Sequence, residues 1–396
     1  MSTSRVRPAA RMAAIHGFGI DGVARAVVGA ASDRWSVLRL ENLDTDLPLP
    51  PEATRVTAQA LTTPKANSWL PFTGDEDLRA AIGDLLVDRC GTRYDPADQI
   101  VVTSGGTEGV LDCLLATVDP GDEVIVTDPT YAGLVNRVRL AGGVPSFVPY
   151  LVVDGEWRLD LESLRAKAAG ARAVIMMSPS MPSGAVLTDD EWRAVCEVCV
   201  EHDLILIYDA AMERVLFDGR EPLHPVRHHG MAERTLVVGS LSKEFRMIGW
   251  RVGWVAGPRE LVEAVGWVHV YNTTTPVGIA RAGATAVLRG DHGHVAACAA
   301  ELERRRDAVL AATAGLPVVR PGGGWSLLID TVALGIEPAR ASAALLRDGA
   351  VAATAMTGWG DAVAARFIRF VFSAEPVDAL RTLPERLTAA GLTRRT

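Results

Sequence analysis

A lysine among small hydroxyl residues, followed by an arginine eight positions later, is the group in this chain whose spacing most favours chemistry. Ser240, Lys243 and Arg251 lie in the run 239–251, Gly-Ser-Leu-Ser-Lys-Glu-Phe-Arg-Met-Ile-Gly-Trp-Arg. A lysine amine condenses with aldehydes, and a planar guanidinium holds phosphate through two parallel charge-assisted hydrogen bonds. The run therefore predicts a pyridoxal 5'-phosphate site, with a Schiff base on Lys243 and the phosphate on Ser240 and Arg251. Alone, the run also fits a surface lysine at a strand end.

The other groups that pyridoxal phosphate needs have candidates elsewhere in the chain. Asp209 ends an apolar run, at the carboxyl end of a predicted strand, and could keep the pyridine nitrogen protonated. Gly105, Gly106 and Thr107 open a helix after a strand, so that free N–H groups would face the phosphate. Tyr131 follows the next strand and could stack on the ring. Each residue also has a structural explanation without a cofactor. Asp209 could cap a loop, the glycines could form an ordinary strand-to-helix turn, and Tyr131 could simply be packed.

Apolar strand-like runs that alternate with helical patterns would position these residues. The runs cover residues 99–103, 123–128, 171–178, 204–209, 235–240 and 252–256. Such alternation indicates a mainly parallel sheet with helices on both faces. We therefore predict a three-layer α/β/α large domain over residues 50–285 and a smaller α+β domain over residues 286–396, which the N-terminal segment 1–49 joins. Helices are expected over 75–88 and 294–314.

Composition and charge restrict the kinds of partner. The chain has 396 residues, 48% of them hydrophobic and 22% charged, and no apolar run of signal-peptide or membrane-span length. A formal charge of −8 without a basic block argues against nucleic acid and membranes as partners. We expect a cytoplasmic location and a small-molecule partner. No metal site is predicted, because the lone C-x-x-C motif of Cys196 and Cys199 favours core packing.

Several motifs, in order along the chain, resemble one enzyme family. Residues 72–81 contain a Gly-x-x-x-Leu-Arg helix start, residues 119–126 read Asp-Pro-Gly-Asp-Glu-Val-Ile-Val, and residues 178–184 match the prolines and glycine of an Asn-Pro-x-Asn-Pro-x-Gly turn. With the run 239–251, these motifs resemble the fold type I pyridoxal phosphate enzymes, specifically the class I/II aminotransferase family related to aspartate aminotransferase. The resemblance implies transfer of an α-amino group between an amino acid and a 2-oxo acid, and a homodimer.

The resemblance also implies roles for individual residues. Lys243 would be both the Schiff base residue and the base that shuttles the substrate proton. Arg369 matches the arginine that binds the substrate α-carboxylate, and Tyr131 matches the stacking aromatic. Trp69 falls where the family has a tyrosine that reaches the neighbouring subunit's phosphate. Gly19 lies in a Gly-Phe-Gly-Ile segment that resembles the family's mobile substrate loop.

Two methionines depart from the family pattern. Met181 takes the place of a substrate-binding asparagine and Met212 that of a tyrosine, both of which donate to the cofactor's ring oxygen in relatives. Thioethers cannot donate hydrogen bonds. Because external donors favour the deprotonated imine, their loss should raise its pKa, and we expect the resting Schiff base to stay protonated at neutral pH. Alternatively, the methionines only fill space and another residue such as Asn272 supplies a donor.

Two other functions remain to be separated from transamination. The same cofactor and scaffold could serve a lyase, cyclase or oxidase that acts on an amino acid. A cofactor-sensing domain of a DNA-binding regulator would need a helix-turn-helix module, for which the segment before the large domain leaves no room. No second arginine is placed to hold a distal carboxylate, so a dicarboxylate preference is not predicted.

Overall fold

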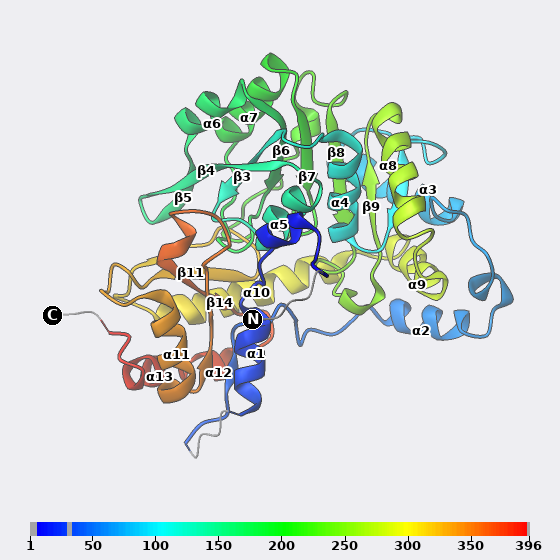
Figure 1. Cartoon of the computed structure of the whole chain (residues 1–396). Coiled ribbons are helices and arrows are strands. Elements are labelled where there is room, and N and C mark those ends of the chain that lie inside the picture. Colours follow the sequence, from blue (N-terminus) through cyan, green and yellow to red (C-terminus); the bar gives the residue numbers. More distant parts are fainter. Residues whose placement is uncertain (1–5, 30–33, 394–396) are drawn as a thin grey trace.

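An eight-stranded sheet forms the centre of the large domain (Figure 1). The computed structural model describes residues 6–29 and 34–393. Most neighbouring strands are parallel, whereas β9 and the edge strand β5 run antiparallel to their neighbours. In spatial order, the strands are β2 (Ile100–Thr103), β9 (Gly253–Ala256), β8 (Thr235–Ser240), β7 (Ile205–Asp209), β6 (Ala171–Met177), β3 (Glu123–Asp128), β4 (Val144–Val153) and β5 (Glu156–Leu159).

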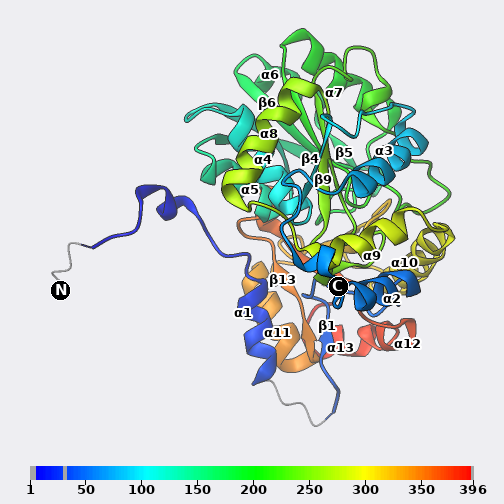
Figure 2. The same ribbon diagram turned by 90° about the vertical axis from the view of Figure 1, so that its right-hand side faces the viewer.

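Helices cover both faces of this sheet, so the central strands are buried and continuously apolar. Figure 2 shows α4 (Gly106–Thr117), α5 (Ala132–Leu140) and α8 (Arg259–Asn272) on one side and α3 (Glu76–Cys90) on the other. The other helices of this part are α2 (Pro51–Ala60), α6 (Leu161–Ala168), α7 (Asp189–Glu201) and α9 (Gly278–Leu288). The architecture is the predicted three-layer α/β/α arrangement.

The apolar runs predicted six of the eight strands to within one residue at each end. The runs did not predict β4 and β5. Pro145 and Pro149 interrupt the apolar pattern of β4, and its outer residues Leu151, Val152 and Val153 are about half exposed. These two strands, at and next to the edge of the sheet, lack the continuous burial that marked the central strands.

Local signals explain where two helices begin and end. The helix α3 ends at Gly91, whose φ of 72° is left-handed and favours glycine. The helix α7 begins after Thr188, whose hydroxyl accepts from the Glu191 N–H at 3.2 Å while the Glu191 carboxylate accepts from the Thr188 N–H at 2.7 Å. This reciprocal capping box satisfies N–H groups that a helix start leaves free.

A smaller sheet lies in the C-terminal part of the chain. Its strands are β10 (Val318–Val319), β11 (Ser326–Asp330), β14 (Phe367–Val371) and β13 (Thr354–Ala355), all antiparallel. The N-terminal segment returns to this part, since β1 (Leu38–Arg39) pairs with β12 (Val351–Ala352), and α1 (Ile20–Val28) lies beside α11 (Pro338–Gly349) in Figure 2. The remaining helices are α10 (Gly293–Ala312), α12 (Val377–Leu380) and α13 (Leu383–Ala389), with 3-10 turns at Ala10–Ala14, Pro64–Asn67, Pro225–Arg227, Ile248–Trp250 and Ala364–Arg366.

Candidate active site

Four strands of the large sheet end at one edge. Thr103 ends β2, Asp128 ends β3, Asp209 ends β7 and Ser240 ends β8. These strands run in the same direction, because β2 and β8 are both antiparallel to β9 while β3, β6, β7 and β8 pair in parallel. The loops that follow them therefore meet at the carboxyl edge of the sheet, where α/β proteins bind ligands.

Arg251 ties the predicted phosphate turn to the lysine run. Its Nη2 lies 3.4 Å from both the Ser104 carbonyl oxygen and Thr107 Oγ1, and its Nη1 lies 3.2 Å from Ser242 Oγ. Gly105 has a φ of 81°, and a Cβ there would overlap the Arg251 guanidinium. A glycine is therefore required beside this arginine.

Gly106 and Ser240 bring the helix start and the strand end together. A Cβ on Gly106 would lie 3.4 Å from Ser240 Cβ. The Ser240 hydroxyl accepts from the Ser242 N–H at 3.1 Å. The first N–H groups of α4 have no partner within the helix, so this corner can hold an anion.

Lys243 and Asp209 are partly buried ionisable groups that are close enough to affect each other. Burial lowers the pKa of Lys243 to about 8, with the Arg369 and Arg251 charges acting in the same direction and Asp209 against it. Burial raises the pKa of Asp209 to about 6, although the Ala211 N–H and Lys243 oppose the shift. Lys243 Nζ lies 4.4 Å from the centre of the Trp325 ring. A partly buried amine and a partly buried carboxylate thus lie in the same part of the site.

Arg369, on β14, has hydrogen-bond donors that are not used within the described part of the protein. Its side chain is completely buried, and Nη2 donates to the Glu41 carbonyl oxygen at 2.8 Å. Nε and Nη1 have no hydrogen-bond partner among the described residues. The guanidinium lies 4.4 Å from the centre of the Trp359 ring, and burial lowers its pKa to about 9. Unpartnered donors on a buried cation favour an anionic ligand such as a carboxylate.

Phe18, Tyr131 and Trp359 form an aromatic cluster beside Arg369. Ring centres are 5.7 Å apart for Phe18 and Tyr131, 5.7 Å for Tyr131 and Trp359, and 6.4 Å for Phe18 and Trp359. The Trp359 indole N–H donates to the Phe18 carbonyl oxygen at 3.0 Å. This cluster joins the predicted stacking residue to the N-terminal segment and to the predicted carboxylate arginine. Sequence reasoning missed Trp359, which lies in an irregular segment without a motif.

Arg137 is a second residue that the sequence did not indicate. Its Nε donates to the Thr107 carbonyl oxygen at 2.6 Å and its Nη1 to the Gly133 carbonyl oxygen at 2.8 Å. A Cβ on Gly133 would overlap both the Tyr131 ring and the Arg137 guanidinium. Burial lowers the pKa of Arg137, and nearby Tyr131 and Asp209 oppose this shift. The guanidinium thus supports the phosphate turn and Tyr131 together.

Met181 and Met212 are buried in the structure, and neither supplies a hydrogen-bond donor for the cofactor's ring oxygen. Met181 and Met212 are 5% and 3% exposed, and neither side chain can donate. Asn272 does not take their place, because its amide donates to Asp112 Oδ1 at 3.2 Å. The Ser180 hydroxyl, next to Met181, is buried without a hydrogen-bond partner among the described residues.

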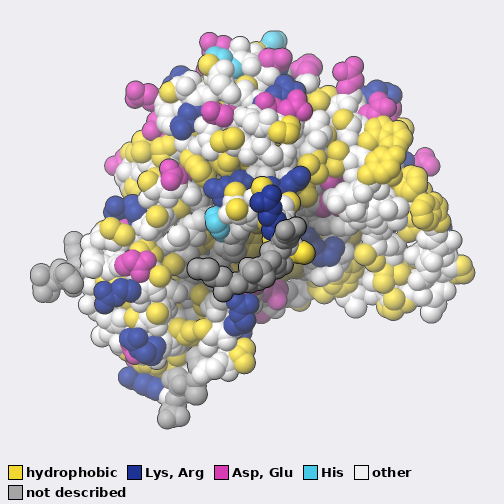
Figure 3. All heavy atoms as spheres, viewed as in Figure 1, with side chains coloured by type: hydrophobic (Ala, Val, Ile, Leu, Met, Phe, Trp, Pro, Cys, Tyr) yellow, Lys and Arg dark blue, Asp and Glu magenta, His cyan; other side chains and the backbone are white. Residues whose placement is uncertain are grey.

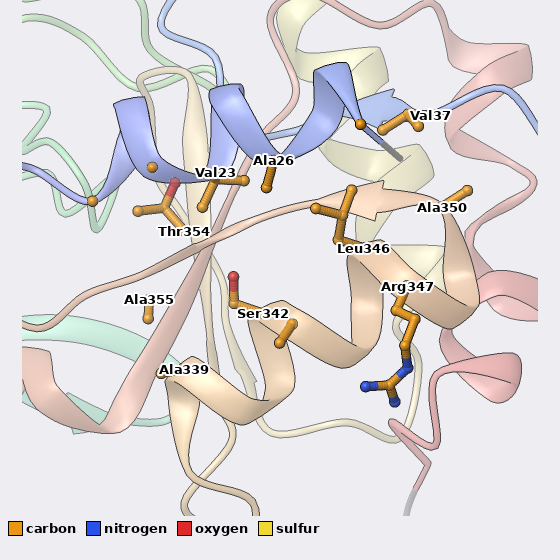
Figure 4. Close-up of a pocket in the computed structure, with 14 residues that line it drawn as sticks. Val23, Ala26, Val37, Ala339, Ser342, Leu346, Arg347, Ala350, Thr354 and Ala355 are labelled. Atoms are coloured by element: carbon orange, nitrogen blue, oxygen red, sulfur yellow. The ribbon is translucent and has the colours of Figure 1, made fainter. Parts of the chain in front are cut away.

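Two predicted residues do not join this buried group within one chain. Trp69 is 73% exposed and meets Phe72 edge-on at 5.4 Å. Gly19 is the N-cap of α1, with a φ of 75°, and lines a cavity of about 680 Å³ between α1 and α11 (Figure 4). Small and apolar side chains such as Val23 and Ala26 dominate that cavity, which does not include Lys243.

The buried groups fit pyridoxal phosphate and an amino acid. Lys243 offers an amine whose pKa is already low, and Asp209 offers a carboxylate for the pyridine nitrogen. The start of α4 and Arg251 offer donors for a phosphate, and Arg369 keeps two N–H groups for a carboxylate. Each requirement of the cofactor and substrate therefore meets a group of suitable charge.

The chain belongs to the aminotransferase class I and II family, whose model matches residues 37–387. It is 34% identical over 303 residues to a probable N-succinyldiaminopimelate aminotransferase of Mycobacterium tuberculosis, covering 75% of this chain and 76% of that protein. Identity to the aspartate/prephenate aminotransferase of Thermus thermophilus is 32% over 304 residues, or 76% and 78% of the two chains. The solved structure of the M. tuberculosis N-succinyldiaminopimelate aminotransferase superimposes with a TM-score of 0.89 at 28% identity, over 97% of this chain and 100% of that one.

The protein is therefore a pyridoxal phosphate-dependent aminotransferase with the type I fold, which transfers an amino group between an amino acid and a 2-oxo acid. The relatives are named as aminotransferases, so the lyase, cyclase or oxidase alternative is not favoured. Within the described ranges, no helix combines the length and apolar character that a membrane crossing needs.

Proposed function

We propose that Lys243 binds the cofactor covalently and moves the substrate proton. Bound pyridoxal phosphate supplies an electron sink that acidifies the substrate Cα–H. Lys243 Nζ would take the proton from the substrate Cα and deliver it to the cofactor carbon C4′, and would act in reverse in the second half of the reaction. A pKa of about 8 keeps part of the amine unprotonated near neutral pH, which a general base requires.

The cofactor would be held at three places around Lys243. Asp209 keeps a proton on the pyridine nitrogen, since with a pKa of about 6 it is largely ionised at pH 7. Tyr131 covers a face of the ring. The phosphate is held by Gly105, Gly106, Thr107, Ser240 and Arg251, and by Trp69 from a second subunit.

Arg369 would orient the substrate by its α-carboxylate. The observation that carries the proposal is that this completely buried guanidinium keeps Nε and Nη1 unpartnered among the described residues, near enough to Lys243 to lower its pKa. A carboxylate held there places the Cα–H bond near the lysine. Met181 would line the substrate position without donating a side-chain hydrogen bond. Gly19 lies outside the group around Lys243 and would line the substrate position only after its segment moves.

A homodimer would cover the exposed aromatic surface around Trp69. Figure 3 shows hydrophobic side chains gathered over α8, where Trp267 and Tyr271 stack at 6.4 Å and are 59% and 85% exposed. Exposed aromatics of this size favour a protein interface. Light scattering should give twice the chain mass, and Trp267→Glu should shift the equilibrium towards monomers.

We also propose a cytoplasmic location and a division of the chain into a segment 1–49, a large domain 50–285 and a small domain 286–396.

The substrate range can be tested directly. We would mix the purified protein with aspartate, N-succinyldiaminopimelate, aromatic amino acids and aliphatic amino acids, and follow the cofactor absorbance. Stoichiometric 2-oxo acid, with the amine recovered on an added 2-oxo acid, is the expected result. Ammonia release or oxygen uptake in place of amine transfer would contradict it.

A further inference from the structure

Two carboxylates and a histidine form a buried cluster behind the predicted phosphate turn. Glu108 and Asp112 lie one turn apart on α4, and His269 lies on α8. His269 Nδ1 is 3.2 Å from Glu108 Oε1 and 3.7 Å from Asp112 Oδ2. Its Nε2 is 3.1 Å from the Phe72 carbonyl oxygen. The side chains of His269 and Asp112 are completely buried, so water does not screen these charges.

The geometry makes the His269 ring an imidazolium. A carbonyl oxygen only accepts, so Nε2 carries a proton, and Nδ1 faces two carboxylates and carries the other. Burial alone would lower the pKa of His269, but the nearby Asp112 and Glu108 carboxylates outweigh burial and raise it to about 9. The titratable groups that face the ring are these two, since the segments at Phe72 and Thr273 present a carbonyl and a hydroxyl.

The three side chains could instead hold a metal ion, because their ligand atoms lie within 4.8 Å of one another. The existing hydrogen bonds argue against this. Glu108 Oε1 already accepts from Thr273 Oγ1 and His269, and Oε2 accepts from the Ser104 N–H. Asp112 Oδ2 is the cluster's one carboxylate oxygen without a hydrogen-bond partner among the described residues, so the imidazolium accounts for most of the site.

Glu108 connects this cluster to the phosphate turn. It lies in the first turn of α4 and holds the Ser104 N–H, while the Ser104 carbonyl oxygen accepts from Arg251 at 3.4 Å. The phosphate would bind at the same helix start. An uncompensated carboxylate there would repel a phosphate dianion and cancel part of the favourable field of the helix.

We propose that His269 is a positioning residue for the cofactor phosphate: its positive charge neutralises Glu108, which holds the Ser104 end of the turn. The inference rests on the proposed phosphate site. His269 would not contact the cofactor, but its positive charge would strengthen binding of the phosphate group. This contribution would be lost when His269 loses its charge.

The test compares two probes that bind without a covalent bond, pyridoxamine 5'-phosphate and pyridoxamine, in the apo-protein. His269→Asn keeps a donor near the Nδ1 position but removes the charge. It should weaken binding of the phosphorylated probe about tenfold, the order expected for one partly buried charge at a helix start, and leave pyridoxamine within about twofold. His202→Asn, at the C-cap of α7, is the matched control and should change neither probe.

A double variant separates the charge from the fold. If neutralisation of Glu108 is the role of His269, Glu108→Gln in the His269→Asn background should restore affinity for the phosphorylated probe to within about threefold of wild type, because the side chain that holds the Ser104 N–H is then neutral. A purely structural role predicts that the double variant is worse than either single variant. Equal loss of both probes in His269→Asn, or no rescue, would overturn the inference.

The pH profile gives an independent readout. Wild-type preference for the phosphorylated probe should hold at pH 7 to 8 and fall as pH rises through about 9, where His269 loses its charge. His269→Asn should lack this fall. A wild-type protein that binds both probes equally would refute the phosphate site and this inference together. A preference that His269→Asn leaves intact would refute the inference alone.

Discussion

The two ends of the proposed active site, a phosphate end at Arg251 and a carboxylate end at Arg369, differ in how many hydrogen bonds their arginines already make. At the phosphate end, Arg251 donates four hydrogen bonds, to Ser242, Ile248, Ser104 and Thr107. At the carboxylate end, Arg369 donates one, to Glu41, and retains Nε and Nη1 without partners among the described residues. Both guanidinium groups lie near Lys243 and lower its pKa.

The difference shows which end of the site is preorganised in the absence of ligand. The phosphate turn is already braced by Arg251 and Arg137, so binding there needs little reorganisation. The carboxylate end instead holds a buried cation with unused donors, which is costly until a carboxylate pairs with it. We expect changes at the first end to alter cofactor retention and changes at the second to alter substrate use.

Removing the lysine between the two ends should have the largest effect. Lys243→Ala should lower kcat for transamination about 10⁴-fold, the upper range for a lost proton-transfer group. Lys167→Ala, on α6, is the control and should stay within about twofold of wild type. Steady-state rates measure both. A Lys243→Ala enzyme that retained a tenth of the wild-type rate would contradict the assignment.

Arg369→Gln tests the carboxylate end. Two charge-assisted hydrogen bonds of about 1.5–3 kcal/mol each would be weakened, so kcat/KM for the amino acid should fall about 100-fold or more. Affinity for pyridoxal phosphate should stay within about threefold of wild type. The control is Arg366→Gln, which removes a half-exposed arginine paired with Asp330 at 2.6 Å. Loss of cofactor affinity in Arg369→Gln would contradict the proposal that Arg369 binds the substrate and not the cofactor.

Asp209→Asn tests whether the free protein is destabilised at its site. The pKa of Asp209 is raised to about 6, so the folded protein binds this proton more tightly than the unfolded chain, and stability is lost as pH rises through 6. The neutral asparagine should therefore raise the free energy of unfolding of the apo-protein at pH 8 by about 1–3 kcal/mol, with little gain at pH 4. Urea unfolding at both pH values measures this. An equal gain at both would implicate packing instead of charge.

Met212→Tyr should have the smallest effect of these substitutions. It tests the donors to the cofactor ring oxygen, which would lie between the two ends. Without donors from Met181 and Met212, the visible absorbance of the cofactor-loaded wild-type enzyme should not change between pH 6 and 8. A tyrosine hydroxyl would favour the deprotonated chromophore and lower its pKa by about one unit. A spectroscopic titration compares the two, with Met231→Leu, remote from these loops, as control. A wild-type transition centred near pH 7 would show that another donor is present.

Local patterns predicted the strand ends and the loop that carry the proposed phosphate end. The strands that end at Thr103, Asp209 and Ser240 are continuously apolar because both faces are covered, and Lys243 and Arg251 follow within one short run. The position of a residue can be predicted from the sequence when it depends on sequence neighbours or on the common edge of a parallel sheet.

Long-range contacts escaped prediction. The Trp359 indole meets the Phe18 carbonyl across 341 positions, and His269 meets Glu108 across 161. Arg137 lies on α5, where an arginine in an otherwise ordinary helix carries no signal. Arg369 was expected only by family resemblance, since a strand arginine is usually exposed. These contacts depend on how α4, α5, α8 and the small sheet pack, which no local pattern specifies.

Borohydride reduction followed by peptide mapping tests the central claim most directly. The chain has three lysines, Lys65, Lys167 and Lys243, so the site of attachment is read without ambiguity. The expected result is one pyridoxyl adduct per chain on the peptide that contains Lys243, and none on the other two. An unmodified Lys243 peptide from the reduced, cofactor-loaded protein would contradict the account.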